Sequence, residues 1–211
     1  MTERPVNIKM PKRINKEKKR SDIMTAAMHV FSQHGISSAR ITEIADAAGV
    51  GKGTIYEYFR SKEDIFLAAF RYHFEEHNKN LLKILNHTQN PVEKLEILIQ
   101  HTLPDFLEKN GEFASIMMDF WAEGIRNKDE KILQELNLKK LYSEYRDLIA
   151  TILVEGIEQN IFRYVDPYSM AAIVIGALDG LMLQWILDHR TLDVRHVSQT
   201  LLDLLINGLK K

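Results

Sequence analysis

The spacing of apolar residues is the feature that most limits the folds open to this chain. Along almost its whole length apolar residues recur three and four positions apart, as on one face of an α-helix, and no stretch shows the sustained apolar and polar alternation of a strand. Prolines interrupt the 211 residues at only five positions. The sequence therefore predicts an all-α fold of about nine helices.

Capping residues and helix breakers predict where these helices begin and end. We expect a first helix from about residue 15 that Gly35 ends, a short second helix capped by Ser38, and a long helix from about residue 129 that stops at Asn160. Side chains suited to capping an N-terminus precede further helices at Ser61, Asn90, Asp166 and Asp193.

Composition excludes several classes of protein. The chain has no cysteine, which excludes a disulfide framework, a thiolate zinc site and a cysteine nucleophile. Its N-terminus carries charged residues where a signal peptide would carry an apolar stretch. We therefore expect a cytoplasmic protein.

The helix expected at residues 170–187 is apolar on nearly every side. Asp179 near its centre argues against a membrane span, because an aspartate there costs about 2.5 to 3.5 kcal/mol on insertion. In a soluble protein such a helix is buried all round, which in a domain of this size requires a partner chain. We expect no membrane association, and a homodimer formed through the helices at about 167–189 and 193–209.

Basic residues concentrate toward the N-terminus. Residues 1–62 hold 12 Lys and Arg against 6 Asp and Glu, whereas residues 63–211 hold 16 against 23. This division indicates that the first part meets a polyanion.

Two short helices joined by a glycine-containing turn lie inside this basic part, which is typical of a helix-turn-helix motif. The residues that carry the pattern are Ile44-Ala45, Ala48-Gly49-Val50, Gly53-Thr54-Ile55-Tyr56, Phe59 and Ser61-Lys62. On this pattern residues 18–66 resemble the DNA-binding segment of the TetR family of transcriptional repressors.

The physical character of these positions agrees with the motif. We expect Ala45, Ala48 and Gly49 to be small because two helices cross closely there. Val50, Ile55 and Phe59 are then expected to fill the core of the three-helix unit. The remaining residues of the second short helix face outward.

The resemblance implies the organisation of the whole chain. It implies a flexible basic arm at 1–15, a helix-turn-helix domain at 16–62, and a helical effector-binding and dimerisation domain at 63–211. It further implies that the protein represses transcription from double-stranded operator DNA and is released by a small apolar or amphipathic effector, with no cofactor.

The resemblance also implies which residues contact DNA. Lys52 and Thr54 would reach base edges, Tyr56 and Lys62 would hold the backbone, and Tyr58 would do either. Two further candidates depart from the family pattern, which often has Ser and Thr in their places: Gly51 and Arg40.

An effector cavity in the C-terminal domain is likewise implied by the family, because its members sense small molecules there. Its candidate lining residues are Met117, Phe120, Trp121, Tyr145, Asp179, Met182 and Trp185. Asp179 either belongs to a structural hydrogen-bond network or meets a polar or cationic group of the ligand. We favour the structural role, since Gly180 beside it indicates tight helix packing.

Two rival motifs deserve comparison with this interpretation. His73, Glu76 and His77 match the H-x-x-E-H spacing of zinc hydrolases, although no strong third ligand is evident, and a solvated helix face is the simpler explanation. The stretch 49–54 looks like the end of a nucleotide-binding loop, but it lacks the first glycine and the preceding strand. The zinc hydrolase remains the alternative function.

Overall fold

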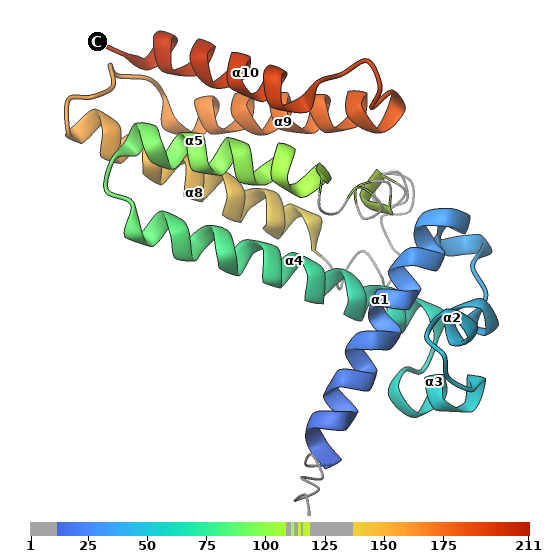
Figure 1. Ribbon diagram of the computed structural model, residues 1–211. Helices are drawn as coiled ribbons and strands as arrows, with labels where there is room; N and C mark the ends of the chain where they lie inside the picture. The colour runs from blue at the N-terminus through green and yellow to red at the C-terminus, as the bar shows by residue number, and fades with distance from the viewer. Residues whose placement is uncertain (1–11, 109–110, 112–113, 115, 119–136) are drawn as a thin grey trace, which may run out of the picture. The chain divides into compact units, whose positions relative to one another are not determined.

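The computed structural model describes residues 12–108, 111, 114, 116–118 and 137–211, the side chains of 12–15, 76 and 77 excepted (Figure 1). The helices with defined bounds are α1 (Lys12–Ser38), α2 (Ile41–Ala47), α3 (Lys52–Tyr58), α4 (Lys62–His87), α5 (Pro91–Thr102), α8 (Leu138–Glu158), α9 (Pro167–Leu187) and α10 (Val194–Leu209). Among these residues the only β pairing is an isolated antiparallel bridge between Phe162 and Lys210. The prediction of an all-α fold is confirmed.

The chain divides into two compact units, the first extending to Phe70 and the second beginning at Arg71, within α4. In the first unit α2 packs against both α1 and α3. Ile23, Ile44 and Ile55, one from each of these helices, are fully buried. The rings of Phe31 and Phe66 meet edge to face at 5.7 Å between centroids, which joins α1 to the start of α4.

The first helices differ from the sequence prediction at their ends. Gly35 does break the helical geometry, with φ of 71°, but another helical turn follows it as far as Ser38. Ser38 is therefore not the cap of α2. Arg40 occupies that position, and its backbone N–H donates to the carboxylate of Glu43 over 2.9 Å, so the cap comes from within the helix.

Gly49 is required for its backbone conformation rather than for its size. Its φ is 63°, in the left-handed region, and a Cβ placed on it would meet nothing within 4 Å. The expectation that Gly49 is small because helices cross closely is wrong. Ala45 is buried, as expected of a small residue at a close helix crossing. Ala48 and Val50 are only half-buried.

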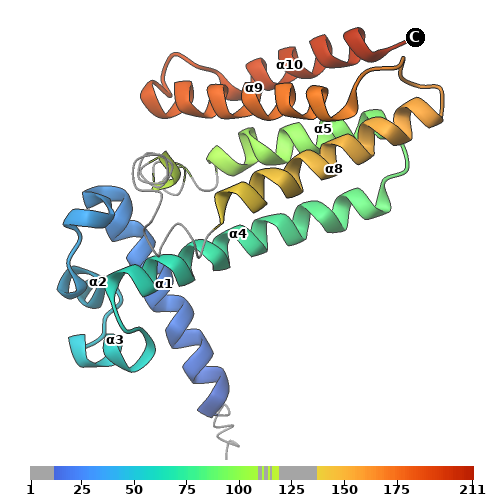
Figure 2. The same cartoon turned by 180° about the vertical axis from the view of Figure 1, so that it is seen from behind.

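The second unit is a stack of helices. Figure 1 and the reverse view in Figure 2 show α9 beside α10 at one edge, α5 and α8 in the next layer, and the second part of α4 beyond α8. Contacts join α8 to α9 and α5, and α10 to α5 and α9. The predicted caps Asn90, Asp166 and Asp193 each accept a backbone N–H at the start of their helix, and Ser61 does so for α4.

The longest predicted helix is shorter than expected. Residues 119–136 lie outside the described residues, and α8 begins only at Leu138, because its N-cap Asn137 has a left-handed φ of 42°. Its predicted stop is confirmed, since Asn160 has φ of 59°. The basic arm expected at 1–15 lies mostly outside the described residues, and α1 already begins at Lys12.

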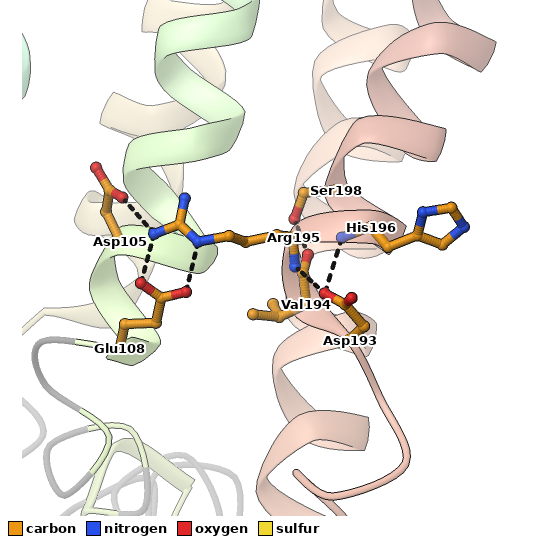
Figure 3. A network of polar contacts seen from close by, with 7 residues as sticks. All are labelled: Asp105, Glu108, Asp193, Val194, Arg195, His196 and Ser198. Carbon is orange, nitrogen blue, oxygen red and sulfur yellow. Dashed lines mark hydrogen bonds and ion pairs between the residues drawn. The ribbon is translucent and has the colours of Figure 1, made fainter.

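Ion pairs made by Lys94 and by Arg195 tie the layers of the second unit. Lys94 on α5 donates to Glu155 on α8 over 2.5 Å, with the Lys94 side chain largely buried. Figure 3 shows Arg195 at the start of α10 reaching the helical turn 104–108, where its Nε donates to Glu108 over 2.6 Å and its Nη2 contacts Glu108 and Asp105. The guanidinium therefore holds two carboxylates at once.

Candidate functional site

The helix α3 buries one residue and exposes most of the others. Ile55 is fully buried, and Phe59, the residue after α3, is 2% exposed. Lys52 is exposed, Thr54 is half-buried, and Tyr56 is 51% exposed. The face that carries Lys52 and Tyr56 is thus available to a partner, as the sequence predicts.

The other expected DNA contacts lie around this helix. Arg40 and Gly51 are exposed at the N-terminal ends of α2 and α3. The Tyr58 ring is half-buried, and the ammonium of Lys16 on α1 lies 5.9 Å from its centroid. Lys62 donates to the carbonyl oxygen of Ser37 over 2.6 Å, which ties α4 to the end of α1. One of the three ammonium hydrogens of Lys62 is therefore used within the protein, and two remain.

A cavity of about 90 Å³ lies inside the second unit, with residues of α4, α5, α8 and α9 in its walls. Four of the residues expected from the sequence line it: Met117, Tyr145, Asp179 and Met182. Its remaining described lining consists of Phe74, Thr102, Phe106, Leu141, Tyr142, Ile175 and Leu178. The lining is mostly apolar, with few polar groups, as small-molecule sites in proteins generally are.

Asp179 is the one carboxylate among the described lining residues, and it is hydrogen-bonded. The Tyr142 hydroxyl donates to its Oδ2 over 2.9 Å. Burial raises the pKa of Asp179 above its ordinary value, and this hydrogen bond opposes part of the rise. Burial and the neighbouring carboxylate likewise raise the pKa of Tyr142. Tight helix packing at Gly180 does not support the structural role of Asp179, because no atom of the described residues lies within 4 Å of a Cβ placed on Gly180.

Two further polar groups line the cavity. The Tyr145 hydroxyl donates to Asn78 on α4 over 2.9 Å, and burial raises its pKa to about 12. The Thr102 hydroxyl oxygen is buried and makes no hydrogen bond within the described protein. An unsatisfied buried hydroxyl in a cavity wall is a group that a bound molecule can satisfy.

The remaining expected lining residues are not among those that form the described wall. Phe120 and Trp121 lie outside the described residues. Trp185 lies on α9 against Gly111, where a Cβ would come within 3.1 Å of its ring, and its ring contacts that of His189. Trp185 therefore contacts Gly111 and His189 and is not among the described lining residues.

Sequence reasoning left several wall residues out of the site. Phe74, Thr102 and Phe106 belong to segments that are far apart in the sequence, and each looks like an ordinary core position by its spacing.

The zinc-binding alternative gains no support from the described residues. No three or more of their His, Asp or Glu side chains lie together in a group that could hold a metal ion. His73 is half-buried, and burial lowers its pKa. The side chains of Glu76 and His77 lie outside the described residues.

The outer pair α9 and α10 leaves apolar surface uncovered. Ile173 and Leu187 on α9 are 61% and 76% exposed, and Leu204 on α10 is 69% exposed. With a mean hydropathy of 1.9, α9 is the one described helix that is long and apolar enough to cross a membrane, and 22% of its most apolar window is buried in the single chain. Exposed apolar side chains on paired helices are typical of an interaction surface.

Comparison with known sequence families gives two matches along the chain. Residues 23–69 match the family described as bacterial regulatory proteins, tetR family. Residues 91–209, more than half of the chain, match the C-terminal domain of BetI-type transcriptional repressors.

Individual relatives match over nearly the full length. The fatty acid metabolism regulator protein of Bacillus subtilis (strain 168) is 25% identical over 92% of this chain and 97% of its own. A structure of the transcriptional regulator FadR from Bacillus subtilis in complex with stearoyl-CoA superposes with a TM-score of 0.74 at 25% identity, covering 89% of this chain and 97% of that one. The structure of a transcriptional regulator from Saccharomonospora viridis in complex with choline superposes with a TM-score of 0.81 at 26% identity. The match covers 92% of this chain and 99% of that one.

Proposed function

From the premise that this chain belongs to the tetR family of bacterial regulatory proteins, we propose that it represses transcription by binding operator DNA through α3 and leaves the DNA when a small amphipathic molecule binds in its second unit. Members of this family are transcriptional regulators and not enzymes, so the zinc hydrolase is withdrawn. The observation that carries the proposal is the outward face of α3, with Lys52 and the half-exposed ring of Tyr56, on a helix-turn-helix unit with its own buried core. Its place of action is the cytoplasm, where the DNA is.

The DNA contacts of this proposal divide into two kinds. Lys52 and Thr54 read base edges from the first turn of α3, and Tyr56 and Lys62 hold phosphates. Arg40, Gly51 and Tyr58 complete the surface. Exposure of Arg40, Gly51, Lys52 and Tyr56 supports these roles, and Lys62 contributes the ammonium hydrogens that Ser37 does not use.

The test is a set of alanine variants in a DNA-binding titration. Tyr56→Ala and Lys62→Ala should weaken binding to operator DNA and to unrelated DNA alike. Thr54→Ala should also reduce the ratio of the affinity for operator DNA to the affinity for unrelated DNA. Tyr164→Ala is the matched control, because Tyr164 is 78% exposed and lies in the second unit. Parent-like binding by both Tyr56→Ala and Lys62→Ala would contradict the assignment.

The effector part of the proposal rests on the cavity. Its apolar wall, the Asp179–Tyr142 pair and the unsatisfied Thr102 hydroxyl suit a molecule with an apolar body and a polar group. The ligands of two similar structures, stearoyl-CoA and choline, each combine apolar and charged parts. Binding shifts the protein away from its DNA-bound state only if the ligand has different affinities for the two states.

We further propose a homodimer built on α9 and α10. Ile173 and Leu204 leave apolar surface exposed on these helices, and Gly176 and Gly180 on α9 leave open space where another backbone can approach. A dimer would present two α3 helices to half-sites about one turn of DNA, or 34 to 36 Å, apart.

The oligomeric state tests this interface. Ile173→Glu and Leu204→Glu should each yield a monomer with weakened operator binding, measured by sedimentation and DNA titration. Tyr164→Glu adds the same charge at an exposed position outside α9 and α10 and should leave the dimer intact. A dimer that survives both substitutions would place the interface elsewhere.

A further inference from the structure

We propose that the effector carries an anionic head group, which binds in an open groove between α4 and α8 beside Lys79 and Lys83 while its apolar tail enters the cavity. The inference rests on the proposed function, since it specifies the chemistry of the ligand that the cavity takes. It adds a second part to the site, outside the apolar wall.

The groove and the cavity share a wall. The groove, of about 870 Å³, is lined by residues of α4 and α8, and Phe74 and Leu141 line both spaces. The Phe74 ring lies 6.4 Å from that of Tyr145, a cavity residue, and the Tyr145 hydroxyl donates to Asn78, a groove residue. These side chains therefore form the boundary that a molecule with its tail in the cavity and its head in the groove would cross.

The charges of the groove favour an anion. Lys79 and Lys83 lie one turn apart on α4, are exposed, and form no ion pair with any described side chain. Lys140 faces them from α8 and lies 3.6 Å from Glu144, so its charge is partly balanced. Glu75 is the other acid in the groove. The described groove thus carries three lysines against two glutamates, and a phosphate or carboxylate beside Lys79 and Lys83 would meet two ammonium groups.

The amides in the groove point to the same chemistry. The Asn78 side-chain oxygen accepts from Tyr145, and the Asn137 side-chain oxygen accepts from the backbone N–H of Lys140. Each of these two oxygens already accepts one hydrogen bond within the protein, and the NH₂ group of each amide can donate to a ligand. Donors beside uncompensated lysines suit a head group rich in acceptor oxygens.

A cationic ligand is the competing possibility, because Asp179 lies in the cavity among aromatic rings. Its carboxylate already accepts a hydrogen bond from Tyr142, and burial disfavours its charged form. The uncompensated charge on the described surface of the site is therefore positive and lies in the groove.

Four probes and two double variants test the proposal by direct titration of the purified full chain, without DNA. The probes are octyl phosphate, octanol, octyltrimethylammonium and inorganic phosphate, which separate the tail from the sign of the head. Octyl phosphate should bind about tenfold more tightly than octanol, equivalent to about 1.4 kcal/mol, and its advantage should shrink in high salt. Inorganic phosphate, which has no tail, should bind more weakly than either alkyl probe.

The variant Lys79→Gln with Lys83→Gln should lose about tenfold in affinity for octyl phosphate and less than twofold for octanol. Lys139→Gln with Lys210→Gln removes the same charge from exposed lysines outside the groove and should bind all probes like the parent. Circular dichroism checks that both variants fold.

The other outcomes would overturn the proposal in distinguishable ways. Equal affinity for octyl phosphate and octanol, or an octyl phosphate affinity that survives the groove variant, would remove the head-group site and leave the apolar cavity in place. Tightest binding of octyltrimethylammonium would assign the charged contact to Asp179. Failure of all three alkyl probes to bind would remove the effector cavity itself, while the DNA titration tests α3 independently.

Discussion

The hydroxyl of Tyr142 on α8 donates a hydrogen bond to the carboxylate of Asp179 on α9 over 2.9 Å. It joins two helices that pack against each other, and both residues line the cavity. The carboxylate is partly buried in a mostly apolar wall, where an unbonded charge is costly. The pair is therefore a structural contact placed where a ligand can reach it.

Removal of the hydroxyl by Tyr142→Phe should lower the free energy of unfolding by about 1 kcal/mol, because the carboxylate loses its donor. The midpoint of thermal unfolding should fall by about 2 to 4 °C for a chain of this size. Tyr164→Phe, at an exposed position, serves as the control and should change neither quantity. An unchanged Tyr142→Phe protein would show that water replaces the hydroxyl without cost.

The pKa of Asp179 gives a prediction with a definite sign. A carboxyl whose folded-state pKa is raised contributes stability that is fully present below its unfolded value, near 3.8, and is lost as pH rises through the folded value. Asp179→Asn cannot ionise. The unfolding free energy of this variant, relative to the parent, should therefore rise between about pH 3 and pH 8, as measured by urea denaturation.

Asp188→Asn provides the opposite case for that experiment. Hydrogen bonds from the Thr191 side chain and the Arg190 backbone lower the pKa of Asp188. Its contribution to stability is therefore present above pH 3.8, the ordinary pKa, and is lost as the pH falls through the lowered pKa. Relative to the parent, this variant should become less stable with rising pH. A pH-independent difference for Asp179→Asn would mean that its carboxyl titrates alike in both states.

Much of the fold could be predicted because its signals are local. Asn90, Asp166 and Asp193 cap helices whose first residues follow at once in the sequence, and Asn160 stops α8 through its own backbone conformation. Ser38 is not the cap of α2, because the helical turn that follows the break at Gly35 extends to Ser38, and the carboxylate of Glu43 supplies the cap of α2.

The cavity could be predicted only in part, because packing between distant segments creates it. Tyr145 and Met182 were found by residue type, yet the same criterion selected Trp185, which packs against Gly111 instead. Phe74 and Thr102 meet there because α4, α5 and α8 are stacked, which no local pattern encodes. The groove could not be predicted from the sequence for the same reason, because two of its residues, Lys83 and Lys140, are 57 positions apart.

Gly49 supplies a prediction about the turn between α2 and α3. Its φ of 63° costs a residue with a Cβ about 1 to 2 kcal/mol, so Gly49→Ala should destabilise the first unit by that amount. Gly53, inside α3, has open space around it and an ordinary φ, and Gly53→Ala should be neutral or stabilising by up to about 1 kcal/mol. Chemical denaturation of the two variants compares them directly, and equal effects would contradict the role given to Gly49.

Arg195 supplies a prediction about local order rather than global stability. Its guanidinium is exposed, so Arg195→Ala should change the unfolding midpoint little, but the turn 104–108 loses its contact with α10. Amide hydrogen exchange at Asp105 to Glu108 should be faster in the variant than in the parent. This difference in rate should be larger at low salt, where the ion pairs of the parent are less screened. Arg190→Ala, an exposed change that spares this contact, is the control, and unchanged exchange at 104–108 would show that packing alone holds the turn.

Gly156 on α8 is the glycine at which the structure leaves least room. A Cβ there would lie 2.0 Å from the ring of Phe162, which is 1% exposed, so neither the ring nor the helix can move aside freely. The backbone N–H groups of Ile161 and Phe162 both donate to the Gly156 carbonyl, which fixes the ring directly over α8. Gly156→Ala should therefore destabilise the second unit by about 1 to 3 kcal/mol or more, despite the helix propensity that alanine adds.

Gly208→Ala is the control for helix propensity, because a Cβ placed on Gly208 in α10 meets no described atom within 4 Å. This variant should be as stable as the parent or more stable. If the double variant Gly156→Ala with Phe162→Leu recovers part of the lost stability, the clash with the ring is the cause; a stable Gly156→Ala single variant would contradict the packing argument.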